Sequence, residues 1–154
     1  MKLGILGTLS IGALLVGQVT LAETVKIGFV TTLTGGAGAI GNDMRDAVEL
    51  ALDHLGRKMG SSNVKMFYED DTFKPDVGKL KTEKLVKKDK VHFVTGYIWS
   101  HVLMASRNSV VGKGPFMITS NAGPGPVAGK LCHEDFFSTS WQNDQTTMAM
   151  GEVL

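Results

Sequence analysis

The residues best suited to bind a ligand form a short segment that joins a predicted strand to a predicted helix. This segment contains Ile98, Trp99 and Ser100, preceded by Tyr97. A serine in the first turn of a helix lies beside free backbone N–H groups and the positive end of the helix dipole, which together attract a carboxylate. Ser100 alone is better explained as a helix N-cap. The two aromatic residues beside it favour a binding surface, because exposed loops rarely keep such side chains without an apolar surface to cover.

A second polar segment follows the next predicted strand. Ser120, Asn121, Ala122 and Gly123 supply a hydroxyl, an amide and accessible backbone. The carboxyl ends of neighbouring strands in a parallel sheet meet at one edge, where ligands bind. We therefore expect both segments to contribute to one crevice, in which hydroxyl and backbone groups suffice for a small carboxylate.

A predicted alternation of strands and helices positions these segments. Apolar runs predict strands at residues 25–31, 64–68, 91–96 and 116–119, with a weaker one at 136–139. Helical spacing predicts helices that open at Asn42 or Asp43, at Asp76, at Ser100 and near residue 143, and the first of these is expected to pack an apolar stripe on the sheet. Residues 120–129 are rich in proline and glycine and are predicted to form a loop. The pattern predicts an α/β domain, a parallel sheet with helices on both faces.

Three glycines in the first strand-to-helix segment match the spacing of a dinucleotide-binding turn. Gly36, Gly38 and Gly41 fit G-x-G-x-x-G. In such a turn the first glycine directly follows the strand, and an acidic residue ends the next strand ~20 positions further on. Here several residues intervene before Gly36, and the acidic residues at the next strand end lie further away. We interpret the segment as a flexible loop that can approach some other ligand, and expect no cofactor.

No group of residues indicates an enzyme or a metal site. Residues 69–71 are acidic but adjacent, and we interpret them as a polar loop at a strand end. The four histidines share no metal-binding register. Ser100 and His101 are neighbours and cannot readily provide the geometry of a nucleophile and its base. We therefore expect a binding protein without catalytic or metal-binding residues.

Residues 1–22 have the pattern of a secretory signal peptide. Lys2 precedes an uncharged apolar stretch, and Thr20 and Ala22 place small residues before a cleavage point at Glu23. A retained membrane anchor is the alternative, but the stretch is shorter than the roughly 20 apolar residues that a bilayer span needs. We predict export to the periplasm, with residues 23–154 forming one domain.

Charge and cysteine content limit the partners. The chain has 16 Lys and Arg against 15 Asp and Glu, so no basic excess favours nucleic acid. The lysine-rich run at residues 79–90 includes Glu83 and Asp89, and we interpret it as a solvated helix face. In an oxidising compartment Cys132 could be a free thiol, a dimer contact or half of a disulfide.

Seven segments together resemble the periplasmic substrate-binding proteins of branched-chain amino acid ABC importers. They are KIGFVTTLTG at 26–35, IGNDMRDAVELALDHL at 40–55, YEDD at 68–71, KPDVGKLKTEKLV at 74–86, VTGYIWS at 94–100, SNAGP at 120–124 and FFSTSWQNDQ at 136–145. The resemblance implies the N-terminal lobe of a two-lobe, flytrap-like type I fold. It also implies a small ligand between the lobes and an inner-membrane ABC permease as partner.

The resemblance leaves the ligand class open. The YIWS and SWQNDQ variants are similar to members that bind aromatic or other organic acids. Amino acids of the branched-chain type and aromatic carboxylates such as benzoate derivatives therefore both remain candidates. A sensory or receptor domain of the same fold is the alternative function.

The resemblance also implies roles for single residues. Ser100 matches the serine that holds the ligand carboxylate, and Asn121 and Ala122 fall where the next loop supplies contacts. Gly123 stands where branched-chain binders usually have threonine. Ile40 falls where several relatives place an aromatic residue that covers the ligand.

A disulfide found in some relatives is expected to be absent. Trp99 stands at the position of one of its cysteines, and Thr72 stands at the position of the other.

Family members continue through a complete second lobe, whereas this sequence stops at Leu154. We therefore expect the chain to provide one wall of the cleft. Because closure of two lobes sequesters the ligand, the isolated 154-residue chain should bind weakly or not at all. Isothermal titration calorimetry with purified chain checks this, and a submicromolar affinity would contradict it.

Overall fold

A computed structural model describes residues 23–153, so the predicted signal peptide at residues 1–22 lies outside the described residues. The elements in chain order are β1 (Val25–Thr31), α1 (Gly38–His54), β2 (Lys58–Met59), β3 (Ser62–Asp70), α2 (Pro75–Lys84), a π-helical turn (Leu85–Asp89), β4 (Phe93–Gly96), α3 (Ser100–Arg107), β5 (Phe116–Thr119), a 3₁₀ turn (Gly125–Ala128), β6 (Phe136–Ser138) and α4 (Asn143–Val153). Within this range no helix is both long and apolar enough to cross a membrane.

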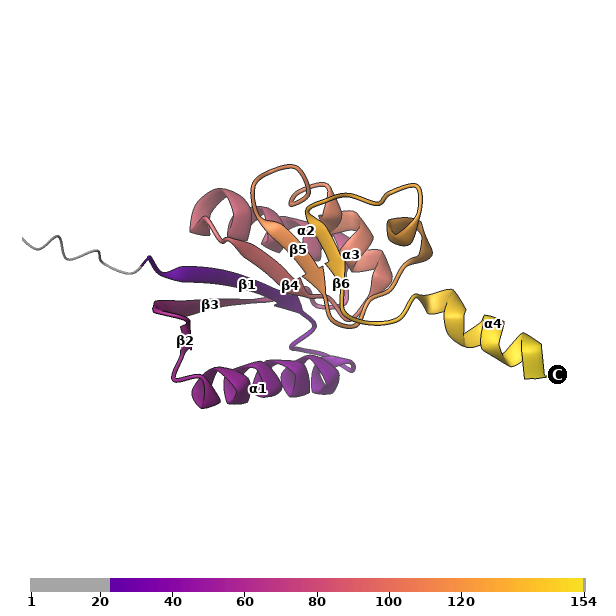
Figure 1. Cartoon of the computed structure of the whole chain (residues 1–154), viewed down its shortest axis with the longest axis horizontal. Helices are drawn as coiled ribbons and strands as arrows, with labels where there is room; N and C mark the ends of the chain where they lie inside the picture. The colour runs from indigo at the N-terminus through magenta and orange to yellow at the C-terminus, as the bar shows by residue number, and fades with distance from the viewer. Residues whose placement is uncertain (1–22, 154) are drawn as a thin grey trace, which may run out of the picture.

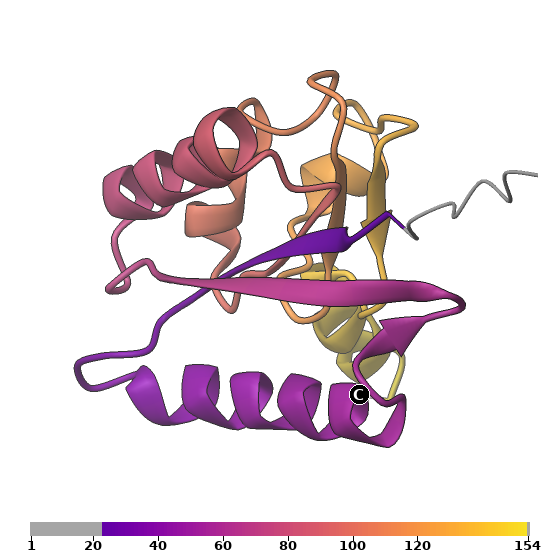
Figure 2. The same cartoon turned by 90° about the vertical axis from the view of Figure 1, so that its left-hand side faces the viewer.

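The strands form one sheet in the order β2-β3-β1-β4-β5-β6. All neighbouring pairs are parallel except the short β2–β3 hairpin. α1 lies on one face of the sheet, and α2 and α3 lie on the other (Figures 1 and 2). The predicted α/β architecture is therefore confirmed. α4 extends away from the sheet at the end opposite the start of β1 (Figure 1).

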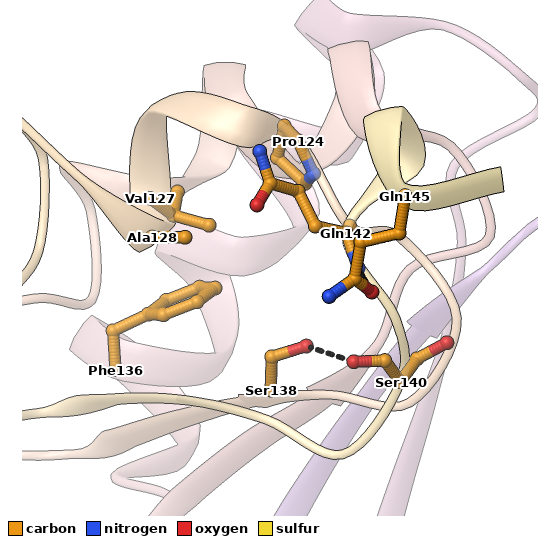
Figure 3. Close-up of a pocket in the computed structure, with 9 residues that line it drawn as sticks. Pro124, Val127, Ala128, Phe136, Ser138, Ser140, Gln142 and Gln145 are labelled. Carbon is orange, nitrogen blue, oxygen red and sulfur yellow. Dashed lines mark hydrogen bonds between the residues drawn. The ribbon is translucent and has the colours of Figure 1, made fainter. Parts of the chain in front are cut away.

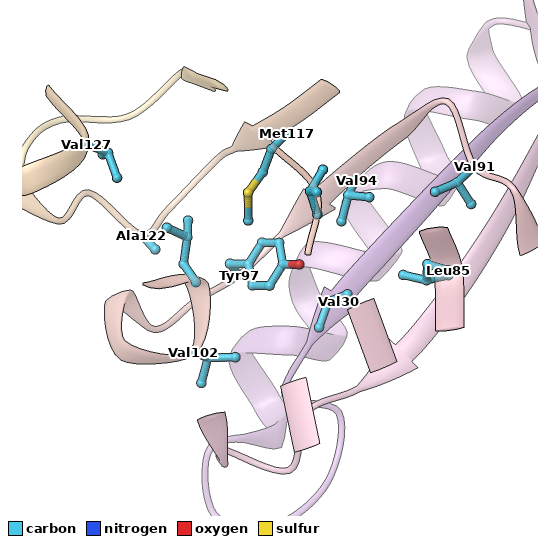
Figure 4. Close-up of a cluster of buried hydrophobic side chains, with 11 residues drawn as sticks. Val30, Leu85, Val91, Val94, Tyr97, Val102, Met117, Ala122 and Val127 are labelled. Carbon is cyan, nitrogen blue, oxygen red and sulfur yellow. The ribbon is translucent and has the colours of Figure 1, made fainter. Parts of the chain in front are cut away.

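The main hydrophobic core lies between the sheet and the α2/α3 layer. Its buried side chains come from β1, β4 and β5, from the turn after β4 and from α3 (Figure 4). They include Val30, Val94, Met117, Tyr97 and Val102. Branched side chains on alternate strand positions fill this layer because one face of each strand points toward the helices.

The opposite face is less well covered than the sequence predicts. Leu52 of α1 is buried, but Ala47, Ala51 and Leu55 of the predicted apolar stripe are exposed. Among the described elements, α1 alone lies on this face (Figure 1). One helix covers only a narrow strip of the sheet. The two sides of that helix and the aromatic rings of Phe116 in β5 and Phe137 in β6 therefore stay in contact with solvent.

α1 begins four residues before the predicted N-cap. Gly38 opens the helix, and the Asn42 amide donates to the carbonyl oxygens of Gly38 (2.7 Å) and Leu33 (3.1 Å) instead of capping. A Cβ on Gly41 would overlap the Thr32 carbonyl oxygen. The interpretation of the glycine segment as a flexible loop is wrong for its second half, since Gly38 and Gly41 lie in the helix and allow it to pack on the end of β1.

α2 also differs from its prediction. Pro75 occupies its first turn, and Lys74, not Asp76, is the N-cap residue. Leu80, predicted on the apolar face, is 67% exposed, whereas Gly78 and Thr82 are buried. A Cβ on Gly78 would overlap a methyl group of α3. Small residues therefore bring α2 and α3 together, and apolar periodicity did not reveal this contact.

The predicted element boundaries are confirmed for β1 and β5 and approximate elsewhere. β4 begins at Phe93 instead of Val91, and α3 ends at Arg107 instead of Val111. The predicted loop at 120–129 contains a 3₁₀ turn. The β2–β3 hairpin and the π-helical turn were not predicted, because elements of two to five residues show no periodicity.

Part of the lysine-rich run is not a solvated face. Lys81 (3.0 Å) and Lys84 form ion pairs with Glu69, which is buried at the end of β3. Burial acts to raise the pKa of Glu69, but the hydrogen bonds from Lys84 and Lys81 outweigh it and hold the pKa below its usual range. These pairs attach α2 to the sheet. Lys87 pairs with Glu83 on the surface at 2.7 Å, as the solvated interpretation expects.

Replacing Gly41 by alanine should destabilise the fold by about 1–3 kcal/mol, because the new methyl group overlaps a backbone carbonyl that cannot move independently of β1. Urea denaturation followed by circular dichroism measures the change. The matched control is Gly36→Ala, which meets nothing within 4 Å and should change stability by no more than about 0.5 kcal/mol. Equal effects of the two substitutions would contradict the packing argument.

Candidate functional site

The carboxyl ends of the parallel strands lie at one edge of the sheet. β1 ends beside β3 and β4, with Thr31 paired to Asp70 and Val30 paired to Gly96, and β4 ends beside β5, with Gly96 paired to Thr119. The loops that follow these strands therefore gather at this edge. This is the place where open parallel sheets bind ligands.

Ser100 is the first residue of α3 and not its N-cap. Trp99 occupies the N-cap position and makes no side-chain capping bond. The Ser100 hydroxyl oxygen instead accepts a hydrogen bond from the Asn143 amide nitrogen at 3.0 Å. The hydroxyl hydrogen can then be donated to a ligand, beside first-turn N–H groups that have no partner within the helix. The alternative interpretation of Ser100 as a plain cap is wrong.

The two predicted segments lie side by side. The Asn121 amide nitrogen donates to the Ile98 carbonyl oxygen at 2.9 Å, and the Ala122 N–H donates to the Tyr97 carbonyl oxygen at 3.1 Å. The side chains of Ile98 and Ala122 are buried. Their side chains therefore do not reach a ligand, and the Ile98 carbonyl oxygen and the Ala122 N–H hold the two segments together.

Tyr97 does not face the candidate site, although its aromatic ring was part of the argument for one. It is fully buried, and its hydroxyl group is hydrogen-bonded to the Thr82 hydroxyl at 2.7 Å. Burial raises the pKa of Tyr97. The exposed aromatic character of the segment comes from Trp99 alone.

Gly123 is required by the approach of the chain that leads into α4. A Cβ on this residue would overlap the Trp141 carbonyl oxygen, and the Asn143 N–H donates to the Gly123 carbonyl oxygen at 2.8 Å. The glycine at this position thus has a packing reason. The same approach places the Asn143 side chain against Ser100.

Ile40 lies in a different part of the surface from Ser100. It is 47% exposed and lines a hollow of about 310 Å³ on the α1 side of the sheet, together with Phe29, Met44 and Asn121. The lining of this hollow includes neither Ser100 nor Trp99. Asn121 is the predicted site residue that connects the two regions.

A second hollow, of about 320 Å³, lies beside the segment that leads into α4 (Figure 3). Its lining contains Gly123 but no other predicted site residue. Phe136 forms an apolar wall, and the amides of Gln142 and Gln145 border the opening (Figure 3). The motif FFSTSWQNDQ carried the only sequence signal for these residues.

Asp71 connects three loops at the sheet edge. It is fully buried, so the interpretation of the acidic run as a polar loop is wrong at this position. Its Oδ1 accepts hydrogen bonds from the Thr32 hydroxyl (2.5 Å) and the Phe73 N–H (2.9 Å). The Thr32 oxygen in turn accepts from the Trp99 indole Nε1 at 3.0 Å. This chain of bonds links the loops after β1, β3 and β4.

Asp70 fixes the same loops from the outer side. Its two oxygens accept from the Leu33 N–H (2.9 Å), the Thr72 N–H (2.8 Å) and the Thr34 hydroxyl (2.5 Å). Burial acts to raise the pKa of Asp70, but these hydrogen bonds outweigh it and hold the pKa below its usual range. Among the described residues no group of three or more His, Cys, Asp or Glu could hold a metal ion. Asp70 and Asp71 instead accept hydrogen bonds from the loops and hold them in place.

A family model described as periplasmic binding protein matches residues 24–154. The chain belongs to the periplasmic binding protein family. The Leu/Ile/Val-binding protein BraC3 of Rhizobium johnstonii is 29% identical to this family member over 100 residues, which are 64% of this chain and 27% of BraC3. The fold expected from the sequence is thereby confirmed as that of a type I periplasmic binding protein.

Solved structures of the family agree with this assignment. An ABC transporter substrate-binding protein from Sphaerobacter thermophilus is 30% identical, with a TM-score of 0.75, over 80% of this chain and 34% of its own. A solute binding protein of an ABC transporter from R. palustris, in complex with benzoate, is 26% identical, with a TM-score of 0.79, over 85% of this chain and 36% of its own. The chain thus spans about a third of the length of these relatives.

Acid should loosen the loops that Asp70 holds. Because its folded pKa lies below its ordinary value of 3.8, ionised Asp70 stabilises the fold above about pH 4, and this contribution is lost as the pH falls through the lower folded pKa. Asp70→Asn should lower the free energy of unfolding at neutral pH and reduce its further loss in acid. Urea denaturation at a series of pH values tests this against Asp43→Asn on the exposed side of α1. Wild-type acid sensitivity in Asp70→Asn would contradict the assignment.

Proposed function

We propose that this chain belongs to the solute-binding component of an ABC importer and captures a small carboxylate at the carboxyl edge of its sheet. The observation that carries the proposal is that the segment ending at Ser100, the first residue of α3, is hydrogen-bonded to the loop at residues 121–123 through Ile98 and Tyr97. These two segments lie side by side at the edge where parallel sheets bind ligands.

The relatives support a carboxylate as the shared feature of the ligand. BraC3 is named a Leu/Ile/Val-binding protein, and the R. palustris protein is in complex with benzoate. Amino acids and benzoate differ in shape and charge but both carry a carboxylate group. A site built around that group would serve either class, and the rest of the pocket would decide between them.

The start of α3 can bind a carboxylate without a cationic side chain. The first-turn N–H groups and the Ser100 hydroxyl are donors, and the helix dipole adds about 0.3–1 kcal/mol for an anion at this end. A hydrogen bond to a charged group contributes roughly 1.5–3 kcal/mol. Asn121 holds the neighbouring loop in place through the Ile98 carbonyl.

We further infer that the importer role places the chain in the periplasm, with residues 1–22 directing export, and that an inner-membrane permease receives the solute. The names of the relatives are those of binding proteins, and we infer no enzymatic activity. The other wall of the cleft would come from a second lobe, which closes over the bound ligand.

Ser100→Ala should weaken binding of a small carboxylate roughly tenfold, because one donor to a charged group is lost. Two-dimensional ¹H–¹⁵N spectra of the 154-residue chain, titrated to millimolar L-leucine or benzoate, measure the affinity from the backbone amide shifts of residues 100–102 and 121–123.

The matched control is Ser61→Ala, which removes a hydroxyl from the exposed turn between β2 and β3. It should bind like the wild type. Equal shifts of these amides in Ser100→Ala and in the wild type would contradict the proposed function.

A further inference from the structure

Three aromatic side chains in mutual contact include the residues before and after Ser100 in the chain, and we call them the aromatic wall. It consists of Phe73, Trp99 and His101. Phe73 meets Trp99 edge to face, with ring centroids 4.6 Å apart, and meets His101 edge to face at 5.2 Å. Phe73 is 48% exposed, Trp99 is half-buried and His101 is exposed. The wall therefore combines tight internal packing with open ring surface.

The position of the wall relates it to the proposed carboxylate site. Trp99 directly precedes Ser100, and His101 directly follows it at the start of α3. In a benzoate-like ligand the ring is bonded directly to the carboxylate carbon. A carboxylate at the start of α3 would thus place its ring within reach of the wall.

One buried oxygen atom holds two members of the wall. Asp71 Oδ1 accepts from the Phe73 N–H at 2.9 Å and from the Thr32 hydroxyl at 2.5 Å, and Thr32 accepts from the Trp99 indole at 3.0 Å. An indole nitrogen can only donate and a carboxylate can only accept, so the Thr32 hydroxyl has a single orientation that satisfies both. Such a bond chain keeps an exposed aromatic surface rigid.

The backbone beneath the wall has conformations that the fold must enforce. Thr72 (φ 49°), Phe73 (φ 64°) and Tyr97 (φ 58°) are all left-handed. This region is uncommon for residues other than glycine, and for a β-branched residue such as threonine it is a true outlier. Backbone strain of this kind concentrates at ligand sites, where the surrounding structure maintains it. Here it occurs in the two loops that present Phe73 and Trp99.

The carboxylates near the wall do not suit an amino acid. An α-ammonium group needs an acceptor, but Asp70 is hydrogen-bonded to three donors of its own loops and Asp71 is fully buried. The ring of an aromatic ligand, in contrast, can contact the aromatic wall by offset stacking or edge to face.

We propose that the aromatic wall receives the ring of an aromatic carboxylate, in preference to an aliphatic amino acid, and that Asp71 and Thr32 are the positioning residues that hold the wall. The inference rests on the proposed function, since it specifies the ligand class of the same site.

The test compares benzoate with L-leucine on the 154-residue chain by ¹H–¹⁵N spectra that include the indole N–H signals. The chain has two tryptophans, and Trp141→Phe identifies the Trp99 indole signal. Benzoate should shift the Trp99 indole and the amides of residues 100–102 at concentrations roughly five to ten times lower than L-leucine. If L-leucine binds as tightly as benzoate, the inference is wrong and the proposed function stands. If benzoate shifts the amides of residues 100–102 but leaves the Trp99 indole signal in place, the inference is likewise wrong and the proposed function stands.

Substitutions at Thr32 distinguish a change in the position of the wall from a general loss of stability. Thr32→Val keeps the shape of the side chain but removes the hydroxyl, so the Trp99 indole signal should move and benzoate affinity should fall roughly fivefold while L-leucine affinity is unchanged. Thr32→Ser restores the hydroxyl and should restore both readouts. Thr147→Val, at an exposed position of α4, is the control and should behave like the wild type.

Trp99→Leu keeps apolar bulk without a ring and provides an independent variant. It should bind benzoate and L-leucine equally. Retention of the benzoate preference in Trp99→Leu, or an equal loss of both ligands in Thr32→Val, would overturn the inference.

Discussion

The buried carboxylate of Asp71 is the interaction on which the arrangement at the sheet edge depends. β1 is hydrogen-bonded to β3 on one side and to β4 on the other, but the loops that follow these strands are not part of the ladder. Asp71 Oδ1 connects these loops through Thr32, Trp99 and the Phe73 N–H. Asp71 Oδ2 has no hydrogen-bond partner among the described residues. Losing the donors to Oδ1 would leave a second buried oxygen unpaired, which is costly, so the loops that supply them are held in a single arrangement. Rigid loops are what a recognition surface requires, because ordering them on binding would reduce affinity.

Close backbone approaches are the second constraint, and three glycines allow them. Gly41 lets α1 pack against the end of β1, Gly78 lets α2 pack against α3, and Gly123 lets the segment before α4 pack against the loop after β5. The last approach has a direct consequence for the site, because it carries Asn143 to the Ser100 hydroxyl. A side chain at position 123 would displace this segment and with it a contact of the proposed ligand-binding residue.

The order of strands and helices was predictable because long-range packing imposes a period on the sequence. Apolar runs and helical spacing located β1, β5 and α4 closely, and the remaining boundaries shifted by a few residues where side-chain burial did not follow the pattern. Leu80 and Leu55 are apolar residues at helical spacing that face solvent. The family was predictable from the joint occurrence of seven short motifs, none of which carries a strong physical signal by itself.

The sequence by itself determined the fold class, the family and the two segments that meet at the sheet edge, because periodicity and strand ends are local properties of the chain. Only the tertiary structure decided how each residue is used. Ser100 is bound by Asn143, 43 residues away, and Trp99 by Thr32, 67 residues away. Tyr97 turns into the core, and Asp71 is buried instead of solvated. Such roles depend on which groups from distant segments come within hydrogen-bonding distance, and no local spacing encodes that distance.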